Sequence, residues 1–466
     1  MHSLFHGASC SNVRFPLQYT PKGEGCQGDG RALFQHPIQE DSMERSVRFI
    51  VAGFFAALPG AELPAQEADS LKEIRRQIDI LTEEIERLKL GEVAETAYEP
   101  QRGLGPAAAK IYRLKNTGVS IAGYGEVVYE NYSKTREDGA AANKTDKIDY
   151  LRNVLYVGFR FNDWILFNSE VEFEHGSTGK GGEVSVEFGY VELMLSPAFN
   201  VRAGMVLPPV GIINEKHEPS TFFGSLRPQV ERSVIPSTWR TNGIGAYGEI
   251  GSSLNYRAYI VEGFNAAKFS DADGVRGGRQ SGASALAENF GVTGRLEFTG
   301  VPGGVFGASF YRGNSGQGQS DSLGTLDAAT MLWSAHAEYT WKSLEFRALI
   351  AGVTVDDAGR VSVLSAKTIG SEMSGWYVVA GYDLMPLFSP GSRHSLAPFV
   401  QYENLNTHAA VATGFTANKA LDRKILTVGL SYKPHPNVAF KVDYQNQKNG
   451  AGTGVNQINA AVNYLY

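Results

Sequence analysis

Apolar and polar side chains alternate with a period of two residues from Gly118 to the final residue, Tyr466. The stretch 164–175 reads WILFNSEVEFEH and the stretch 437–445 reads NVAFKVDYQ, and the same pattern recurs between them. In a β-strand successive side chains point to opposite faces, so each stretch would have one apolar and one polar face. The pattern therefore predicts an all-β structure built from many such strands.

Sixteen strands are predicted from this alternation. An even number places both ends of the sheet on the same side, and a closed antiparallel sheet leaves no unpaired edge. The predicted strands are 118–132, 150–162, 164–175, 183–196, 199–207, 242–251, 253–264, 289–299, 303–312, 330–341, 343–354, 374–384, 395–405, 423–433, 436–446 and 455–466.

The connections between these strands alternate in length. The segments 133–149 and 265–288 are long, whereas the turns that follow the next strands, 162–163 and 300–304, are short. Transmembrane barrels of bacterial outer membranes sort their connections in this way, with short turns on the side of the termini. No apolar run approaches the roughly 20 residues that a membrane-spanning helix needs. We therefore predict a 16-stranded antiparallel transmembrane β-barrel over 118–466, embedded in the lipid of a Gram-negative outer membrane.

The third long connection, 208–241, has an unusual composition. It contains more than thirty residues, broken by prolines, so it is either disordered or functional. Disordered segments lack aromatic residues and carry excess charge, whereas this one holds Phe222, Phe223 and Trp239 and a near balance of charge. We predict that it folds into the barrel lumen and sets the width of a pore.

The N-terminal part of the chain does not follow the two-residue period. Residues 1–42 have no periodicity and are interpreted as an extension from a start codon assigned too early. Residues 43–65 have the basic, apolar and small-residue order of a signal peptide with a cut after Ala65, although a short buried helix is the alternative. Cys10 and Cys26, the only cysteines, precede this cut, so the mature chain would have none.

The segment 66–91 has the apolar spacing of a coiled-coil helix over about three heptads. We predict a periplasmic stalk that assists assembly of a homotrimer, followed by a linker at 92–117 that is rich in Gly, Ala and Pro. A single amphipathic helix on the barrel is the alternative, and the Ile and Leu placement in the later heptads favours a dimer. The candidate oligomerisation residues are Leu71, Ile74, Ile78, Leu81, Ile85 and Leu88.

Several sequence runs resemble the bacterial porins related to the phosphate-selective porins O and P. These runs are AGYGEVVYENY (122–132), EVEFEH (170–175), RAGMVLPPVGIINEKHEPSTFFG (202–224), VIPSTW (234–239) and FGVTGRLEFTGVPG (290–303). The resemblance implies a trimeric outer-membrane barrel of sixteen strands whose third external loop folds inward. Phosphate selectors of that family use a ladder of arginines and a lysine cluster, whereas Lys216 is the only lysine in this loop.

The final strand alternates up to its aromatic last residue, Tyr466, and resembles the C-terminal recognition signal of outer-membrane porins. This resemblance implies that the outer-membrane assembly machinery is a partner.

The predicted pore-lining residues are charged side chains on the polar faces of strands and in the third long loop. Opposite charges across a constriction sort ions, although the same charges can merely keep a lumen wet and neutralise one another. The candidates are Arg160, Arg202, Arg257, Arg295, Arg347, Glu170, Glu172 and Glu174 on strands, and Glu215, Lys216, His217, Glu218, Arg227 and Arg232 in the loop.

Other motifs carry little weight. The GxGxxG run at 243–248 is followed by a strand where a nucleotide site needs a helix, and GSTGKG at 176–181 lacks the Ser or Thr of a phosphate loop. SDADG at 270–274 lacks the later ligands of a calcium loop, so no metal or cofactor is predicted. The net charge of −6 with no basic domain argues against a nucleic-acid partner.

The favoured function is passive diffusion of small hydrophilic solutes or ions, including anions such as phosphate, through a water-filled channel. The main alternative is a structural or adhesive barrel with a closed lumen. A transporter is disfavoured because 66–117 is too short for a folded plug domain. A barrel enzyme is disfavoured because nothing near His175 and Ser177 marks an oxyanion site.

Overall fold

The computed structural model of the chain describes residues 76–77, 100–177, 179 and 181–466. The predicted extension 1–42, the signal peptide 43–65 and the coiled-coil positions Leu71, Ile74, Ile78, Leu81, Ile85 and Leu88 lie outside the described residues. These predictions therefore remain predictions.

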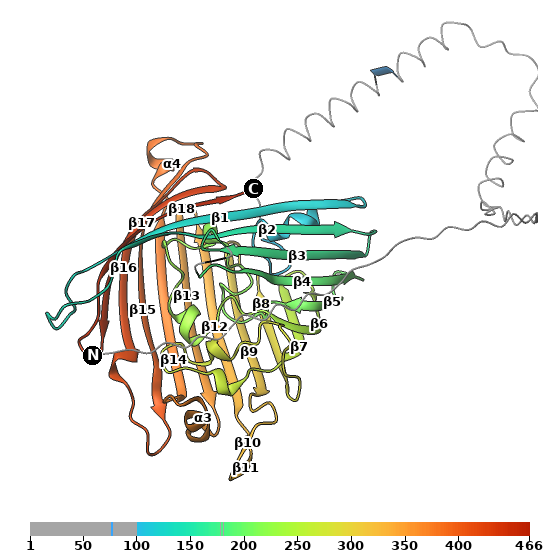
Figure 1. Cartoon of the computed structure of the whole chain (residues 1–466). Coiled ribbons are helices and arrows are strands. Elements are labelled where there is room, and N and C mark those ends of the chain that lie inside the picture. The colour runs from blue at the N-terminus through green and yellow to red at the C-terminus, as the bar shows by residue number, and fades with distance from the viewer. Residues whose placement is uncertain (1–75, 78–99, 178, 180) are drawn as a thin grey trace, which may run out of the picture. The chain divides into compact units, whose positions relative to one another are not determined.

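Sixteen strands form one closed antiparallel barrel (Figure 1). Each strand pairs with its neighbour in the sequence, and β18 pairs with β1 to close the ring. The barrel strands are β1 (Gly118–Tyr132), β2 (Lys147–Arg160), β3 (Ile165–Glu174), β4 (Val184–Met194), β5 (Asn200–Val206), β6 (Thr241–Ile250), β7 (Leu254–Glu262), β8 (Phe290–Phe298), β9 (Gly304–Asn314), β12 (Ala329–Trp341), β13 (Leu344–Val355), β14 (Gly370–Tyr382), β15 (Ser395–Val411), β16 (Asp422–His435), β17 (Val438–Asn449) and β18 (Gln457–Leu465). The predicted fold class and strand number are confirmed.

The last residue completes the closure. The backbone N–H of Gly123 donates to the Tyr466 carbonyl, and the N–H of Tyr466 donates to the Gly123 carbonyl, each at a distance of 2.9 Å. The observed strand ends differ most from the prediction at β15, which continues to Val411 instead of stopping at 405. The hydrogen-bonded ladder there runs on as far as the pair Gly370 and Val411, beyond the residues whose outward side chains are apolar, so hydropathy gave no signal for it.

The outer face of the barrel is apolar, and the inner face carries the buried charged side chains of the strands together with apolar residues such as Leu166, Leu332 and Leu349. Large apolar side chains that point outward are exposed, including Ile121, Ile244, Ile260, Val292, Phe310, Ile350, Val442 and Ile458. The residues between them point inward and are buried, including Glu170, Arg202, Arg257, Thr293, Arg295, Ser309, Glu403 and Asn459. An apolar exterior around a polar interior is the arrangement of a barrel that spans a bilayer.

The connections are sorted between the two ends of the barrel. We call the end with the long connections the loop end and the other the turn end. Figure 1 shows α3 (Ala358–Ser365) and the small hairpin of β10 (Ser320–Asp321) and β11 (Gly324–Thr325) at the loop end, opposite α4 (Met385–Phe388) at the turn end. None of the described helices is long and apolar enough to cross a bilayer.

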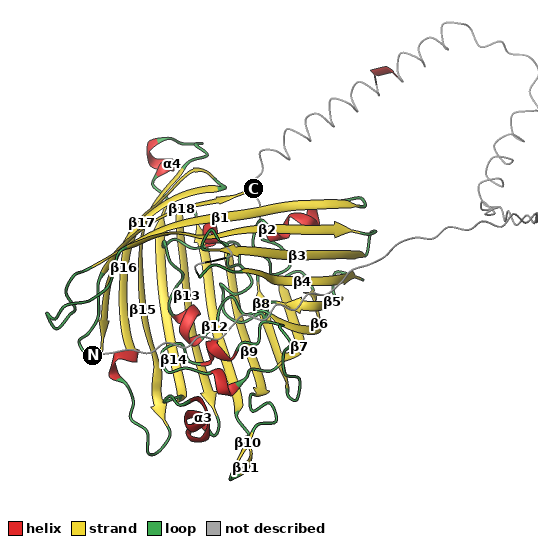
Figure 2. Cartoon of the chain, viewed as in Figure 1, coloured by secondary structure: helices red, strands yellow, loops and turns green. Residues whose placement is uncertain are grey.

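Three segments fill the interior of the barrel. The first is the third long loop, 207–240, with the short helices η2 (Pro219–Thr221) and η3 (Val230–Val234). The second is part of the fourth loop, with η4 (Ala266–Lys268) and η5 (Val275–Gly278), and the third is 100–117, with η1 (Ala108–Arg113). Figure 2 shows short helices in red within the ring of yellow strands.

The inward fold of the third loop was predicted, whereas the interior position of 100–117 was not. The content of Gly, Ala and Pro in 92–117 had favoured a linker. Leu104, Ala107 and Ile111 are at most 1% exposed and join one apolar cluster with the barrel wall. Small residues favour a linker in isolation, but they also fit a narrow space between a wall and a loop.

Candidate functional site

The third loop is packed against the wall by apolar side chains. The Trp239 ring stacks on Phe264 with centroids 4.5 Å apart and meets Tyr311 edge-on at 5.1 Å. Val210, Ile212, Val230, Val234 and Ile235 of the loop are buried in the same cluster. The loop is therefore a fixed part of the interior, as its aromatic content predicted.

Two carboxylates and two arginines join the loop to strands β7 and β8. Glu215 of the loop lies 3.2 Å from Arg257 and 3.1 Å from Arg295. Glu297 of β8 contacts the same two arginines at 2.5 and 3.1 Å. Each of these four side chains is at most 9% exposed. These four charges neutralise one another inside the barrel. This agrees with the alternative stated above, in which the charges do not sort ions.

A second set of polar contacts holds the middle of the loop. Glu231 accepts hydrogen bonds from the Ile213 amide and the Tyr377 hydroxyl, both over 2.6 Å. Burial raises the pKa of Glu231, and these two donors oppose the shift. Lys441 of β17 donates to the loop carbonyls of Pro219, Phe222 and Gly224. The loop is thus attached to several strands around the ring.

His217 of the loop pairs with Glu170 of β3 across 3.0 Å, and both side chains are at most 2% exposed. Burial lowers the pKa of His217, but the Glu170 carboxylate and the Asn214 carbonyl oppose this effect, and the net pKa is raised. The adjacent Glu218 accepts from the amides of Ala107 and Ala108. Burial raises the pKa of Glu218 to about 7, against the effect of these two donors.

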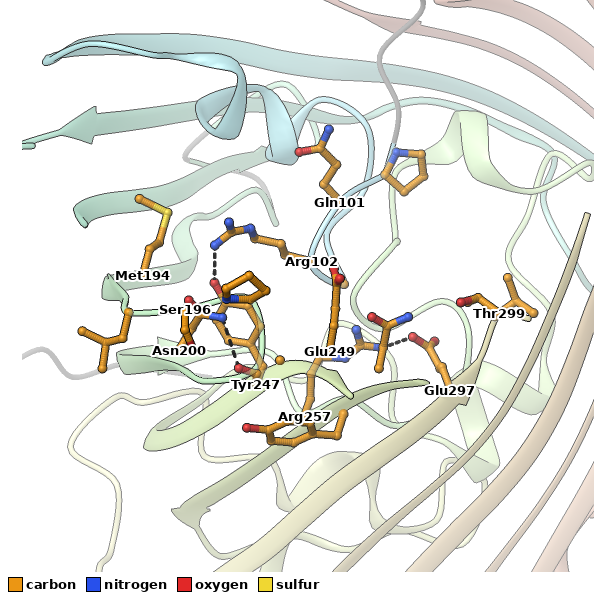
Figure 3. Close-up of a pocket in the computed structure, with 18 of the residues that line it drawn as sticks. Gln101, Arg102, Met194, Ser196, Asn200, Tyr247, Glu249, Arg257, Glu297 and Thr299 are labelled. Carbon is orange, nitrogen blue, oxygen red and sulfur yellow. Dashed lines mark hydrogen bonds and ion pairs between the residues drawn. The ribbon is translucent and has the colours of Figure 1, made fainter. Parts of the chain in front are cut away.

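A cavity of about 690 Å³ opens at the turn end. Figure 3 shows Arg102 pointing toward Tyr247, with Arg257 and Glu297 paired on another side of the cavity. Its charged lining consists of Arg102, Lys216 and Arg257 with Glu249 and Glu297, a near balance.

A second cavity, of about 450 Å³, lies at the loop end and has a different charge balance. Its charged lining comprises seven basic residues and four acidic ones, namely Lys144, Lys147, Arg152, Arg227, Arg232, Arg276 and Arg423 with Glu126, Glu130, Asp149 and Glu174. Three of the carboxylates are already paired, Glu126 with Arg152 at 3.1 Å, Glu130 with Lys147 at 2.8 Å and Asp149 with His175 at 2.7 Å.

Four arginines of this cavity have no carboxylate partner within ion-pair distance among the described residues. Arg227 donates to the His217 carbonyl at 3.0 Å, and Arg423 donates to the Ala272 carbonyl at 3.3 Å. Arg276 donates to the carbonyl of Ser237 and to the Thr238 hydroxyl, and Arg232 is exposed in the cavity. Burial, followed by repulsion from Arg279 and Arg232, lowers the pKa of Arg276. An anion in this cavity would relieve that repulsion.

The predicted pore-lining residues fall into separate groups rather than one ring. In the interior, Arg202 pairs with Glu192 at 2.8 Å, Glu172 with Arg152 at 3.3 Å, Lys216 with Glu338 at 3.3 Å, and Arg347 with Glu338 at 3.5 Å. Glu174, Arg227 and Arg232 line the loop-end cavity. Arg160 lies at the turn end, where it donates to the Asp163 carbonyl over 3.0 Å.

The prediction missed several residues of the interior. Glu192, Glu297 and Glu338 pair with predicted arginines and lie on the inner face of their strands, so the same alternation would have found them. Arg276 and Arg423 lie in a loop and at a strand end, where the alternation gives no signal.

Comparison with known proteins gives one relative with clear sequence identity. No family model matches the chain. An "uncharacterized protein" of Aquifex aeolicus (strain VF5) is 38% identical over 372 residues, which is 77% of this chain and 82% of that one. The chain belongs to the same family as this Aquifex protein. This membership assigns no activity to the chain.

Solved outer-membrane porins share the fold. OmpF of Salmonella typhi, in a complex with daunomycin, superposes with a TM-score of 0.51 at 12% identity over 75% of this chain and 98% of that chain. An anion-selective porin from Comamonas acidovorans has a TM-score of 0.48 at 13% identity over 75% of this chain and all of that one. At 12% identity the likeness to OmpF concerns the fold alone. The closer resemblance to the phosphate-selective porins O and P stays a prediction.

Proposed function

We propose that the chain forms an outer-membrane channel for passive diffusion of small hydrophilic solutes or ions, with a preference for anions such as phosphate. The observation that carries the preference is the excess of basic side chains in the loop-end cavity. Three of its arginines donate to carbonyl groups and the fourth is exposed, and none of the four has a carboxylate partner among the described residues. Charges that line a pore set its ion selectivity. The polar inner face and the cavities at both ends support the channel itself.

The closed, structural barrel is the second candidate. The observation that favours it is the dense packing between the two cavities, where Glu215, Arg295 and His217 are at most 4% exposed. Currents in planar bilayers separate the two candidates. Stepwise currents from folded protein support the channel, whereas the absence of current from the folded wild type and from every folded variant would support the closed barrel.

Removing unpaired loop-end charge tests the preference for anions. We expect the double variant Arg232→Gln with Arg423→Gln to lower the chloride-to-potassium permeability ratio about twofold or more, because two cations leave the cavity lining. The ratio is obtained from the reversal potential in a potassium chloride gradient. Lys424→Gln is the matched control, because Lys424 neighbours Arg423 on β16 but is exposed and does not line the cavity.

Phosphate is tested separately. Millimolar inorganic phosphate should reduce the chloride current of the wild type more than that of the double variant. An unchanged permeability ratio in the double variant would contradict the anion preference. A chloride current that does not change when phosphate is added would show that phosphate is not a ligand, and it would leave the preference for anions in place.

The state of assembly is also a proposal. We infer a homotrimer that carries a periplasmic stalk at 66–91 and is inserted through recognition of the last strand by the outer-membrane assembly machinery. Sedimentation in detergent of the wild type and of a variant with Ile78→Asp and Leu81→Asp would measure the contribution of the stalk. An unchanged mass would mean that the stalk does not hold the chains together.

A further inference from the structure

The segment 101–113, here called the plug segment, lies inside the barrel without being a strand of it. Its backbone pairs with itself, through Gln101 and Leu104, rather than with the barrel ladder. It enters β1 at Gly118, at the turn end. A segment that is attached to the wall at one end and contributes no rung to the ladder can leave the lumen without opening the sheet.

The plug segment divides the turn end of the lumen. The 690 Å³ cavity is lined in part by Pro100, Gln101, Arg102 and Gly103. Two further cavities, of about 320 and 180 Å³, both touch Pro106, and the smaller one also touches Pro100. Three cavities at this end are thus bounded by one short stretch of chain. Its departure would join them into a wider passage.

The polar contacts of the plug segment reach the third loop, β3 and β4, while its Leu104, Ala107 and Ile111 side chains pack in the apolar cluster at the barrel wall. The Glu218 carboxylate accepts from the Ala107 amide at 3.0 Å and from the Ala108 amide at 2.9 Å. Glu192 of β4 accepts from Arg102 at 3.3 Å and from the Tyr112 hydroxyl at 2.9 Å. Water can replace the protein partner in each of these hydrogen bonds. Exposure of Leu104 and Ile111, each 1% exposed when the segment is in place, opposes its departure.

Two glycines allow this close approach. A Cβ atom at Gly105 would lie 2.6 Å from Oε1 of Glu218, and one at Gly103 would lie 2.6 Å from Oε1 of Glu215. Such distances are shorter than real Cβ contacts. The plug segment therefore lies against two of the loop carboxylates that were predicted to line the pore, and a larger residue at either position would force the carboxylate to shift.

We propose that the plug segment is an internal gate, which closes the turn end of the channel while seated on Glu218 and opens it by leaving the lumen as a unit. This gate rests on the proposed channel function. It makes a short stretch next to the first strand a regulator of conductance. A force applied to the chain before residue 101 would also act on the contact between the plug segment and Glu218.

A disulfide lock tests the gate. A Cβ atom built at Gly158 of β2 lies 3.2 Å from the Ile111 Cβ, close to the separation of about 3.5–4.5 Å found in disulfides. The variant Ile111→Cys with Gly158→Cys should therefore form a bond in a chain that has no other cysteine after residue 26. We expect the oxidised protein to lose its large openings, and reduction with dithiothreitol to restore them at least twofold in mean single-channel conductance.

A variant that displaces the plug segment should change the mean conductance in the opposite direction to the disulfide lock. Gly105→Val should unseat the plug segment and raise the mean conductance at least twofold, and Glu218→Ala should do the same by removing the acceptor. Gly179→Val is the matched control, because Gly179 is exposed in the second loop and a Cβ there meets only the Ser177 hydroxyl at 3.9 Å. Far-ultraviolet circular dichroism and heat-modifiable migration verify that each barrel is folded.

The outcomes separate the gate from the channel. A mean single-channel conductance that is the same in the disulfide variant, oxidised or reduced, and in the opening variants would overturn the gate and leave the channel function intact. Silence from every folded variant would overturn the channel and the gate together. A silent wild type with a conducting Gly105→Val variant would support a channel that rests in its closed state. As a second readout, Ala107→Cys should react faster with a soluble maleimide in the Glu218→Ala background.

Discussion

Replacing both Arg257 and Arg295 with Glu is expected to detach the third loop from β7 and β8. The change would leave four carboxylates in a space where every side chain is at most 9% exposed, with Glu215 and Glu297 losing their partners. Breaking a buried ion pair by removing one partner costs about 3–5 kcal/mol. We expect a lower midpoint of urea unfolding in detergent micelles and faster proteolysis within 207–240.

The control for this variant is Arg360→Glu. Arg360 forms ion pairs with Asp321 at 2.8 Å and Asp357 at 3.1 Å, but both aspartates are more than 40% exposed at the loop end. Solvent screens exposed ion pairs and they contribute little to stability, so this variant should unfold nearly as the wild type does. If the double variant instead keeps the wild-type stability and changes only the reversal potential, Arg257 and Arg295 face water in the channel, as the sequence analysis supposed.

Replacing Glu231 with Leu is expected to have the second largest effect. The variant leaves the Ile213 amide and the Tyr377 hydroxyl without their acceptor, and both residues are at most 2% exposed. An unsatisfied buried donor costs about 1–3 kcal/mol, so the loss is about 2–6 kcal/mol for the pair. The third loop should become sensitive to protease at a temperature at which the wild type resists, and thermal unfolding in detergent should begin earlier.

Glu231→Gln is the matched control, because its amide oxygen still accepts one of the two bonds and its shape is unchanged. The pKa of Glu231 is raised by burial, so the folded protein holds its proton more tightly than the unfolded chain does. The stability contributed by the acid is therefore greatest at low pH and declines as the pH rises above its ordinary value of about 4.3. The free energy of unfolding of the Gln variant, relative to that of the wild type, should therefore increase from pH 5 to pH 8. Equal stability of the Leu and Gln variants at both pH values would contradict the assigned contacts.

The barrel was predictable because its signal is local. In β7 the buried Arg257 and Tyr259 alternate with the exposed Ile260, and this direction of each side chain follows from the geometry of a strand alone. The sorting of long and short connections then determines the end to which each belongs. The inward fold of the third loop was also predictable, from aromatic residues such as Trp239 that a disordered loop would lack.

The interior of the barrel was predictable only in part. Arg202 was identified as an inward residue, but its partner Glu192 lies on the adjacent strand, and only the strand register places the two side by side. The four arginines of the loop-end cavity come from three segments, the third loop, the fourth loop and β16. No spacing in the sequence relates these segments to one another.

The amino-acid sequence by itself determined a closed ring of sixteen strands with an apolar exterior, a polar interior and an inward third loop, because side-chain direction depends on near neighbours in the chain. Only the tertiary structure decided which charges cancel, which arginines stay unmatched and that residues 101–113 lie on Glu218 inside the lumen. The amides of Ala107 and Ala108 meet that carboxylate from 111 and 110 residues away. A contact over such a separation exists only once the wall has closed around both segments.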